Sequence, residues 1–279
     1  MEVDFMILFS KPKLILMWLL GGILCLIESY FLIRYAAPVA SGGEGGLSLF
    51  YEANNGASFT IIGTICYFLW FLLTPLVYSS QAIKARVNHF DYQLITRSGG
   101  LKVYWFRVLK TNAGIVFIYF LSVQLLRIVL ITLFYAPFHF TKVSFFLTNQ
   151  HYYIFKDGFW NLAAFLILSC LGQTIFSSLV LIVGMFLKNY VAYLPSGLVV
   201  GLTAILISGI FLPFSPNSSS FLAHVVSLNA IITPGLQPIG AYAPTFNGGV
   251  VFILSFFLYG ILCAGLFSLR MYLDKRNGH

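Results

Sequence analysis

The sequence predicts an all-α integral membrane protein. Of its 279 residues, 59% are hydrophobic and only 9% are charged, whereas about 25% of the residues of an average soluble domain are charged. Apolar runs of about 20 residues, the length that an α-helix needs to cross a bilayer, recur along the chain. We expect one membrane domain over residues 1–279 with six transmembrane helices, at residues 14–35, 58–79, 113–137, 159–187, 191–213 and 249–273.

Basic residues predict the orientation of the chain, because cytoplasmic loops of membrane proteins collect Lys and Arg. Twelve of the sixteen basic residues lie before the first span, between the second and third, between the fourth and fifth, or in the last turn of the sixth and beyond it. These places are all on one side of a six-pass chain, so we predict that both termini are cytoplasmic. The net charge of +8 has the same explanation and does not indicate a nucleic-acid partner.

Three segments are expected on the opposite, outer side. Residues 36–57 are rich in Gly and Ser, which is typical of a flexible loop. Residues 138–158 are rich in aromatic residues, which settle at membrane interfaces. The longest segment, 214–248, has an apolar centre at 221–232 that is too short to span and is followed by three prolines. We predict a re-entrant or interfacial helix there.

Residues 81–110, between the second and third spans, form a basic, amphipathic segment with six Lys or Arg and one acid. Four apolar residues recur at spacings of four, three and four, which places them on one face of a helix: Ile83, Val87, Phe90 and Leu94. The triplet at 98–100, Ser-Gly-Gly, breaks this helix before a second amphipathic stretch. The pattern fits a helix–turn–helix that offers its turn to a partner, or a basic loop that binds anionic lipid and only fixes the topology.

Two charged residues lie deep inside predicted spans, where burying a charge is costly and marks a site. Glu28 is fourteen residues beyond Leu14, and Arg127 is fourteen residues beyond Ala113. At about 1.5 Å per residue, both lie about 21 Å from the inner edge. We therefore predict an ion pair between the first and third helices, with Arg34 as the alternative partner. The pair either fastens the helices together or belongs to a transport path.

Motifs of the common enzyme classes are absent from the sequence. It has no Gly-Lys-Ser/Thr of a phosphate-binding loop, no H-E-x-x-H and no GxSxG nucleophile elbow. None of the five histidines has a Cys, Asp or second His at ligand spacing, and the four cysteines fall inside apolar runs, as small buried hydrophobes do. We predict that this chain is not an enzyme and has no catalytic residues, metal site or cofactor.

The arrangement resembles the permease subunits of type-2 ABC transporters. The shared features are six spans with both ends inside, a long first cytoplasmic loop, a short second one, and an apolar re-entrant segment before the last helix. Within the loop, residues 94–98 (Leu-Ile-Thr-Arg-Ser) and Lys110 match the turn and the lysine of the family, and Asp91 takes the place of its acid. The Glu-x-x-x-Gly spacing and the proline of the family are missing.

The resemblance implies a coupling helix that fits a groove on a cytosolic ABC ATPase subunit, which itself holds ATP and Mg. The coupling residues would be Ile83, Val87, Phe90, Asp91, Leu94 and Arg97. Residues 1–10 would form an interfacial helix nearby, for which a disordered terminus is the alternative.

A second permease chain, identical or related, and membrane lipids are the other partners implied. The expected function is export of a hydrophobic or amphipathic substrate, such as an antimicrobial peptide, across the plasma membrane of a bacterium. The alternative is a non-transporting membrane scaffold, or an assembly or immunity protein, whose basic loop binds a cytosolic client.

Overall fold

The computed structural model describes residues 11–36, 45–54, 61–140, 154–155, 157–211, 218–236 and 247–276. Within these ranges the regular structure is helical, apart from one isolated bridge between Gly45 and Phe138. The predicted segment at 1–10 and most of the aromatic outer segment lie outside the described residues. The helices are α2 (Lys11–Phe31), η1 (Leu32–Ala36), α4 (Gly46–Asn54), α5 (Ile61–Leu76), α6 (Ser79–Val87), α7 (Asp91–Ser98), α8 (Leu101–Phe134), α9 (Gly158–Gly184), α10 (Tyr190–Tyr193), α11 (Ser196–Phe211), α12 (Ser218–Val226), α13 (Asn229–Ile232) and α14 (Gly248–Arg276).

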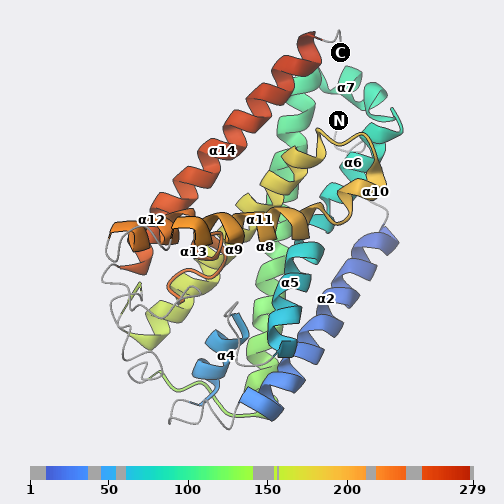
Figure 1. Ribbon diagram of the computed structural model, residues 1–279. Helices are drawn as coiled ribbons and strands as arrows, with labels where there is room; N and C mark the ends of the chain where they lie inside the picture. Colours follow the sequence, from blue (N-terminus) through green and yellow to red (C-terminus); the bar gives the residue numbers. More distant parts are fainter. Residues whose placement is uncertain are drawn as a thin grey trace.

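Four helices are long and apolar enough to cross a membrane: Pro12–Tyr35, Leu101–Phe134, Gly158–Gly184 and Gly248–Arg276. In Figure 1, α8 runs from the top of the bundle to its bottom and α2 runs in the same direction along the lower half, whereas α9 and α14 run back towards the top. These helices match the first, third, fourth and sixth predicted spans. The prediction of an all-helical, multi-pass membrane protein is therefore confirmed. α8 starts well before the predicted position 113, because neither Gly nor Pro occurs at residues 101–113.

The second predicted span, 58–79, is bent. α5 contains Pro75 next to its last residue, and the chain turns by 56° between Ile61–Leu76 and Ser79–Val87. Proline removes a backbone N–H donor, and its ring clashes with the preceding turn, so a helix bends or ends there. The described residues therefore contain four candidate crossings, or five if the bent pair is one span.

The fifth predicted span, 191–213, corresponds to α10 and α11, and α11 has only 16 residues. A helix of that length is about 24 Å long, which is shorter than the hydrocarbon core of about 30 Å. In Figure 1, α11 lies across the long helices and not along them. Gly197 and Gly201 allow it to approach α5 closely, since a Cβ added at either glycine would overlap Phe71. A straight fifth crossing is thus not seen within the described residues.

The described part of the predicted flexible loop at 36–57, residues 45–54, is helical. Gly46–Asn54 form α4, a helix in which all nine residues are buried. The rings of Phe50 and Tyr51 pack edge-on against Phe165 of α9. α4 has only about two and a half turns, too few to display a helical period in the sequence, and its glycine-rich flank dominates the local composition. α4 therefore packs into the bundle.

The apolar segment before the last helix forms two short helices, α12 and α13. Both pack on α14, and α13 also packs on α9. Side chains of these long helices donate hydrogen bonds to backbone carbonyl oxygens at the ends of the short ones: Ser255 Oγ to Val225 O at 2.7 Å, Tyr259 Oη to Val226 O at 2.7 Å, and Ser169 Oγ to Ile232 O at 2.6 Å. Such bonds satisfy carbonyls that would otherwise lack a partner at a helix end, which is the condition for irregular backbone at membrane depth.

The approach of α13 to α9 depends on Gly172, because a Cβ at this position would overlap the Ile231 carbonyl oxygen. We predict that Gly172→Ala lowers the free energy of unfolding by about 1–3 kcal/mol, the usual cost of overpacking. Gly260→Ala in α14 is the matched control, since nothing lies within 4 Å of its added Cβ. Thermal unfolding of the purified protein in detergent measures both variants. Equal stability of the two would contradict the close packing of α13.

Candidate functional site

The basic segment 81–110 contains two short helices and the first turns of α8. We call residues 79–98, which comprise α6, α7 and the turn between them, the elbow. The predicted break after α7 is confirmed: the helix ends at Ser98, and Gly99 has a φ of 85°, which glycine adopts without strain. A second break, which the sequence pattern did not predict, separates α6 from α7. There His89 has a φ of 57°.

The predicted coupling residues of the elbow do not share one environment. Ile83 and Leu94 are 0% and 8% exposed and belong to the largest core cluster, and Val87 packs against that cluster. Phe90, at 49%, and Arg97 are exposed. In this structure Ile83 and Leu94 therefore anchor the elbow to the bundle and cannot contact a partner. An amphipathic pattern identifies the face of a helix that is buried, but not what buries it. In the elbow this face packs against the core of the same chain.

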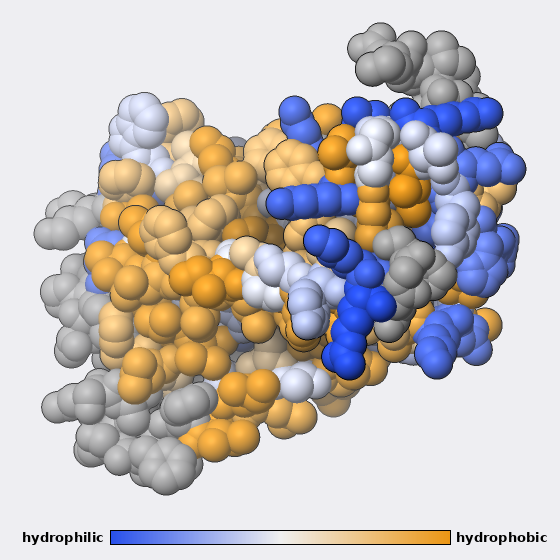
Figure 2. Space-filling model, turned by 90° about the horizontal axis from the view of Figure 1, so that it is seen from above, coloured by the Kyte–Doolittle hydropathy of each residue, from blue (hydrophilic) through white to orange (hydrophobic). Residues whose placement is uncertain are grey.

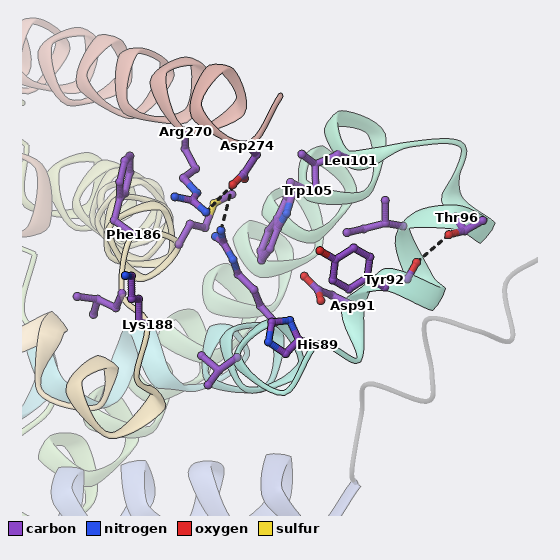
Figure 3. Close-up of a pocket in the computed structure, with 15 residues that line it drawn as sticks. His89, Asp91, Tyr92, Thr96, Leu101, Trp105, Phe186, Lys188, Arg270 and Asp274 are labelled. Atoms are coloured by element: carbon purple, nitrogen blue, oxygen red, sulfur yellow. Dashed lines mark hydrogen bonds and ion pairs between the residues drawn. The ribbon is translucent and has the colours of Figure 1, made fainter. Parts of the chain in front are cut away.

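A cavity of about 610 Å³ lies behind the elbow. Its walls come from the elbow, the start of α8, the turn after α9 and the end of α14, as Figure 3 shows. This volume is in the range of ligand pockets, which is roughly 300–1,000 Å³. The walls combine aromatic rings with charged side chains, among them Tyr92, Trp105, Phe186, Arg86, Lys188 and Arg270.

Two arginines and one carboxylate, which we call the clasp, join the elbow to the last helix. Asp274 forms ion pairs with Arg86 of α6, at 3.5 Å, and with Arg270 of α14, at 2.5 Å. The Arg86 guanidinium lies over the ring of Trp105, 5.6 Å from its centroid. The Arg270 guanidinium lies over Phe186 at 5.5 Å. The clasp thus holds α6, α8, α14 and the turn after α9 together at one end of the bundle.

Asp91, the first residue of α7, is a buried carboxyl at the elbow. Burial raises its pKa from 3.8 to about 6, because the charged form is poorly solvated. The pKa is higher in the folded than in the unfolded chain. The stability that this group contributes is therefore complete below about pH 4 and is lost as the pH rises through about 6. At neutral pH the elbow holds a carboxylate that its surroundings disfavour.

The structure brings the two predicted intramembrane charges together. Arg127 Nη2 of α8 forms a buried ion pair with Glu28 Oε2 of α2, and the side chains are 2% and 1% exposed. Arg34, the alternative partner, is exposed at the end of η1.

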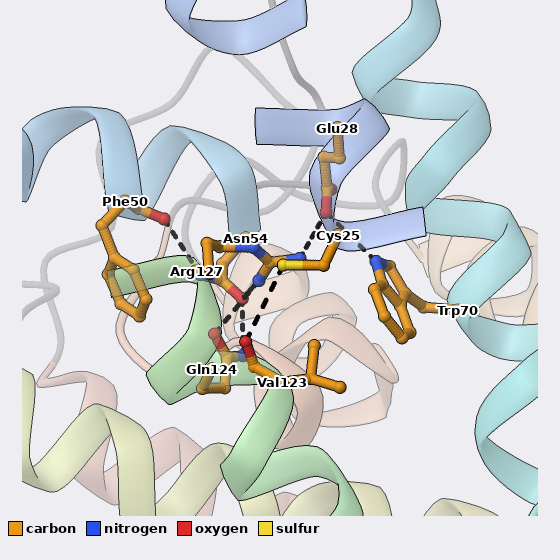
Figure 4. A network of polar contacts seen from close by, with 8 residues as sticks. All are labelled: Cys25, Glu28, Phe50, Asn54, Trp70, Val123, Gln124 and Arg127. Carbon is orange, nitrogen blue, oxygen red and sulfur yellow. Dashed lines mark hydrogen bonds and ion pairs between the residues drawn. The ribbon is translucent and has the colours of Figure 1, made fainter. Parts of the chain in front are cut away.

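Three further side chains, Asn54, Gln124 and Trp70, complete this network, which Figure 4 shows. Asn54, the last residue of α4, accepts through Oδ1 from Arg127 Nη1 and from Gln124 Nε2, both at 2.7 Å. Trp70 of α5 donates from Nε1 to Glu28 Oε2 at 3.2 Å. The roles of Asn54 and Trp70 were not predicted. The sequence gives one indication that such partners are needed. A buried guanidinium has five N–H donors, and one carboxylate cannot accept from all of them.

The network joins α2, α4, α5 and α8, and its two charges cancel. A buried ion pair is stable only when additional hydrogen bonds offset the loss of hydration, and Asn54, Gln124 and Trp70 supply them. Of the two predicted roles, fastening the helices together is the one that this enclosed geometry favours. Among the described residues, no group of three or more His, Cys, Asp or Glu could hold a metal ion.

Comparison of the chain with protein-family models, with curated proteins and with solved structures finds no match.

The buried ion pair yields a test of its own. We predict that Glu28→Leu and Arg127→Met each destabilise the protein by about 3–5 kcal/mol, because each leaves one charge buried without its partner. The double variant Glu28→Leu/Arg127→Met buries no lone charge, so it should lose much less than the sum of the two. Thermal unfolding in detergent of the three variants and the wild type measures this difference. Additive losses would show that the two charges do not depend on each other.

Proposed function

We propose that this chain is a six-pass permease subunit of a type-2 ABC exporter. The direction of the helices supports six passes. α9 and α14 both run towards the end where the elbow lies (Figure 1), so the chain has to turn back between them. We assign the fifth pass to α11, although it lies across the bundle in this structure. The bent pair α5–α6 returns the chain in the same way after α4.

The charge of the elbow end supports a cytoplasmic orientation for it. α14 ends at this end of the bundle, and the first residues of α2 are on the side of α2 that is nearer to it (Figure 1). Four exposed basic residues belong to the elbow, to the turn after α9 and to the end of α14: Lys84, Arg97, Lys188 and Lys275. Viewed onto this end, hydrophilic side chains gather on one part of a largely hydrophobic surface (Figure 2). The excess of Lys and Arg on the cytoplasmic side of membrane proteins then directs the elbow and both termini into the cytoplasm of a bacterium.

The power for transport comes from another chain in this proposal, since the sequence has no Gly-Lys-Ser/Thr of a P-loop. ATP and Mg belong to a cytosolic ABC ATPase subunit, and a second permease chain completes the path through the lipid. The observation that carries the proposal is the exposed tip of the elbow, Phe90, on a unit that packing and the clasp attach firmly to three long helices.

The mechanism follows from these attachments. α6 continues from α5 across the bend, and only two glycines lie between α7 and α8. Arg86 of α6 is bound to Asp274 of α14. A push on Phe90 and Arg97 by the closing ATPase would therefore move the inner ends of α5, α8 and α14 together. The cargo is a hydrophobic or amphipathic molecule such as an antimicrobial peptide, a class that rests on the family resemblance. A membrane scaffold that binds a cytosolic client through the basic elbow is the alternative.

We predict that the protein co-purifies from its native membrane with a chain that carries Gly-x-x-x-x-Gly-Lys-Ser/Thr. Phe90→Asp should release most of that chain, because it places a charge on the exposed apolar tip of the elbow, while the amount of permease in the membrane stays unchanged. Lys13→Asp is the matched control, since it also adds negative charge at an exposed position of the elbow end, in α2. A complex that survives Phe90→Asp refutes coupling through the elbow. A client without a P-loop favours the scaffold.

A further inference from the structure

Several buried polar atoms in and around the Glu28–Arg127 pair have no hydrogen-bond partner within the described part of the chain, and two of them belong to residues that line one cavity. These two are Arg127 Nε, a donor on α8, and Gln173 Oε1, an acceptor on α9. The two residues are 2% and 1% exposed. More than about 90% of buried polar groups in folded proteins are paired, with protein or with ordered water, so each exception requires an explanation. A bound molecule that accepts from one atom and donates to the other is the simplest one.

Both residues line the same small cavity. It also borders Asn54, Tyr67, Phe71 and Thr233, which come from α4, α5 and the turn after α13. The space available to a guest is about 10 Å³, which is about the smallest space that holds one water molecule. A cation is disfavoured by the adjacent guanidinium, and an organic ligand does not fit.

We propose that this cavity is a binding site for a single water molecule. The water accepts a hydrogen bond from Arg127 Nε–H and donates one to Gln173 Oε1, which gives it two polar partners among the two to four that buried waters have. The neighbouring Thr233 hydroxyl, which donates to Asn229 O at 3.0 Å, has lone pairs that can accept the second hydrogen of the water.

The water connects the side chains of the ion-pair network to Gln173, with which they share no direct hydrogen bond among the described contacts; elsewhere α9 bonds directly to α8 through Ser177 and to α4 through Asn161. On one side is the ion-pair network of α2, α4, α5 and α8. On the other is α9, which carries Gln173 and holds α13 through Ser169. A bridging water is nearly as favourable as a direct hydrogen bond, so polar contact extends from Glu28 through Arg127 to Gln173 of α9, the helix whose Ser169 holds α13. This inference does not depend on the proposed transport function.

Radiolytic footprinting of the wild-type protein in detergent tests the proposal. Hydroxyl radicals that form from a bound water in an X-ray beam oxidise the side chains around it, including those that bulk solvent does not reach. Phe71, which is 0% exposed, lines the cavity, whereas Phe165, which is 1% exposed, packs in the outer cluster away from it. The proposal predicts that Phe71 is oxidised several-fold faster than Phe165. Equal rates would overturn it.

The variant Gln173→Leu provides a second test. Leucine is similar in size to glutamine but lacks the Oε1 atom that accepts the hydrogen bond from the water. The oxidation of Phe71 should fall to the level of Phe165 in this variant. Unchanged oxidation of Phe71 would overturn the role of Gln173 in holding the water. Since the wild-type comparison stands by itself, the proposal remains testable if the variant does not fold.

Discussion

A carboxylate and a guanidinium enclosed among apolar helices, Glu28 and Arg127, constrain the half of this structure that lies away from the elbow. Neither can leave the other without becoming an unpaired charge in surroundings that solvate it poorly. One carboxylate does not saturate five N–H donors, so acceptors must come from elsewhere. This requirement explains why α4 folds back into the bundle, because Asn54 at its end supplies the missing acceptor. Residues from four helices thus gather around Arg127.

A second arginine–carboxylate centre, the clasp, organises the other end of the bundle, and α8 connects the two. α8 carries Trp105, on which Arg86 lies, and Arg127, which belongs to the buried network. These residues are separated by about 33 Å of continuous helix. A displacement of the elbow would therefore reach the ion pair through a single rigid element. In the proposed exporter, α8 would therefore transmit the movement of the elbow to the Glu28–Arg127 pair more directly than the bent α5 would.

Composition and run length were sufficient to predict the helical membrane fold and the four longest helices, because both depend on local sequence. Depth along a helix was sufficient to pair Glu28 with Arg127. Run length failed where tertiary packing decides: α11 lies across α5 because Gly197 and Gly201 permit it, and α4 is buried despite its glycine-rich flank. The elbow shows a related limit. Its apolar face was visible in the sequence, but whether that face meets a partner or its own core was not.

The measurement that tests this account most directly is the side of the membrane on which the elbow lies. In a variant whose four native cysteines are replaced, single cysteines are placed at Gln93 in the elbow and at His139, just after α8, both of which are exposed. Intact cells are then treated with a membrane-impermeant maleimide. The account predicts rapid labelling at position 139 and labelling at position 93 only after the membrane is permeabilised. Labelling of position 93 in intact cells, with protection of position 139, would contradict it.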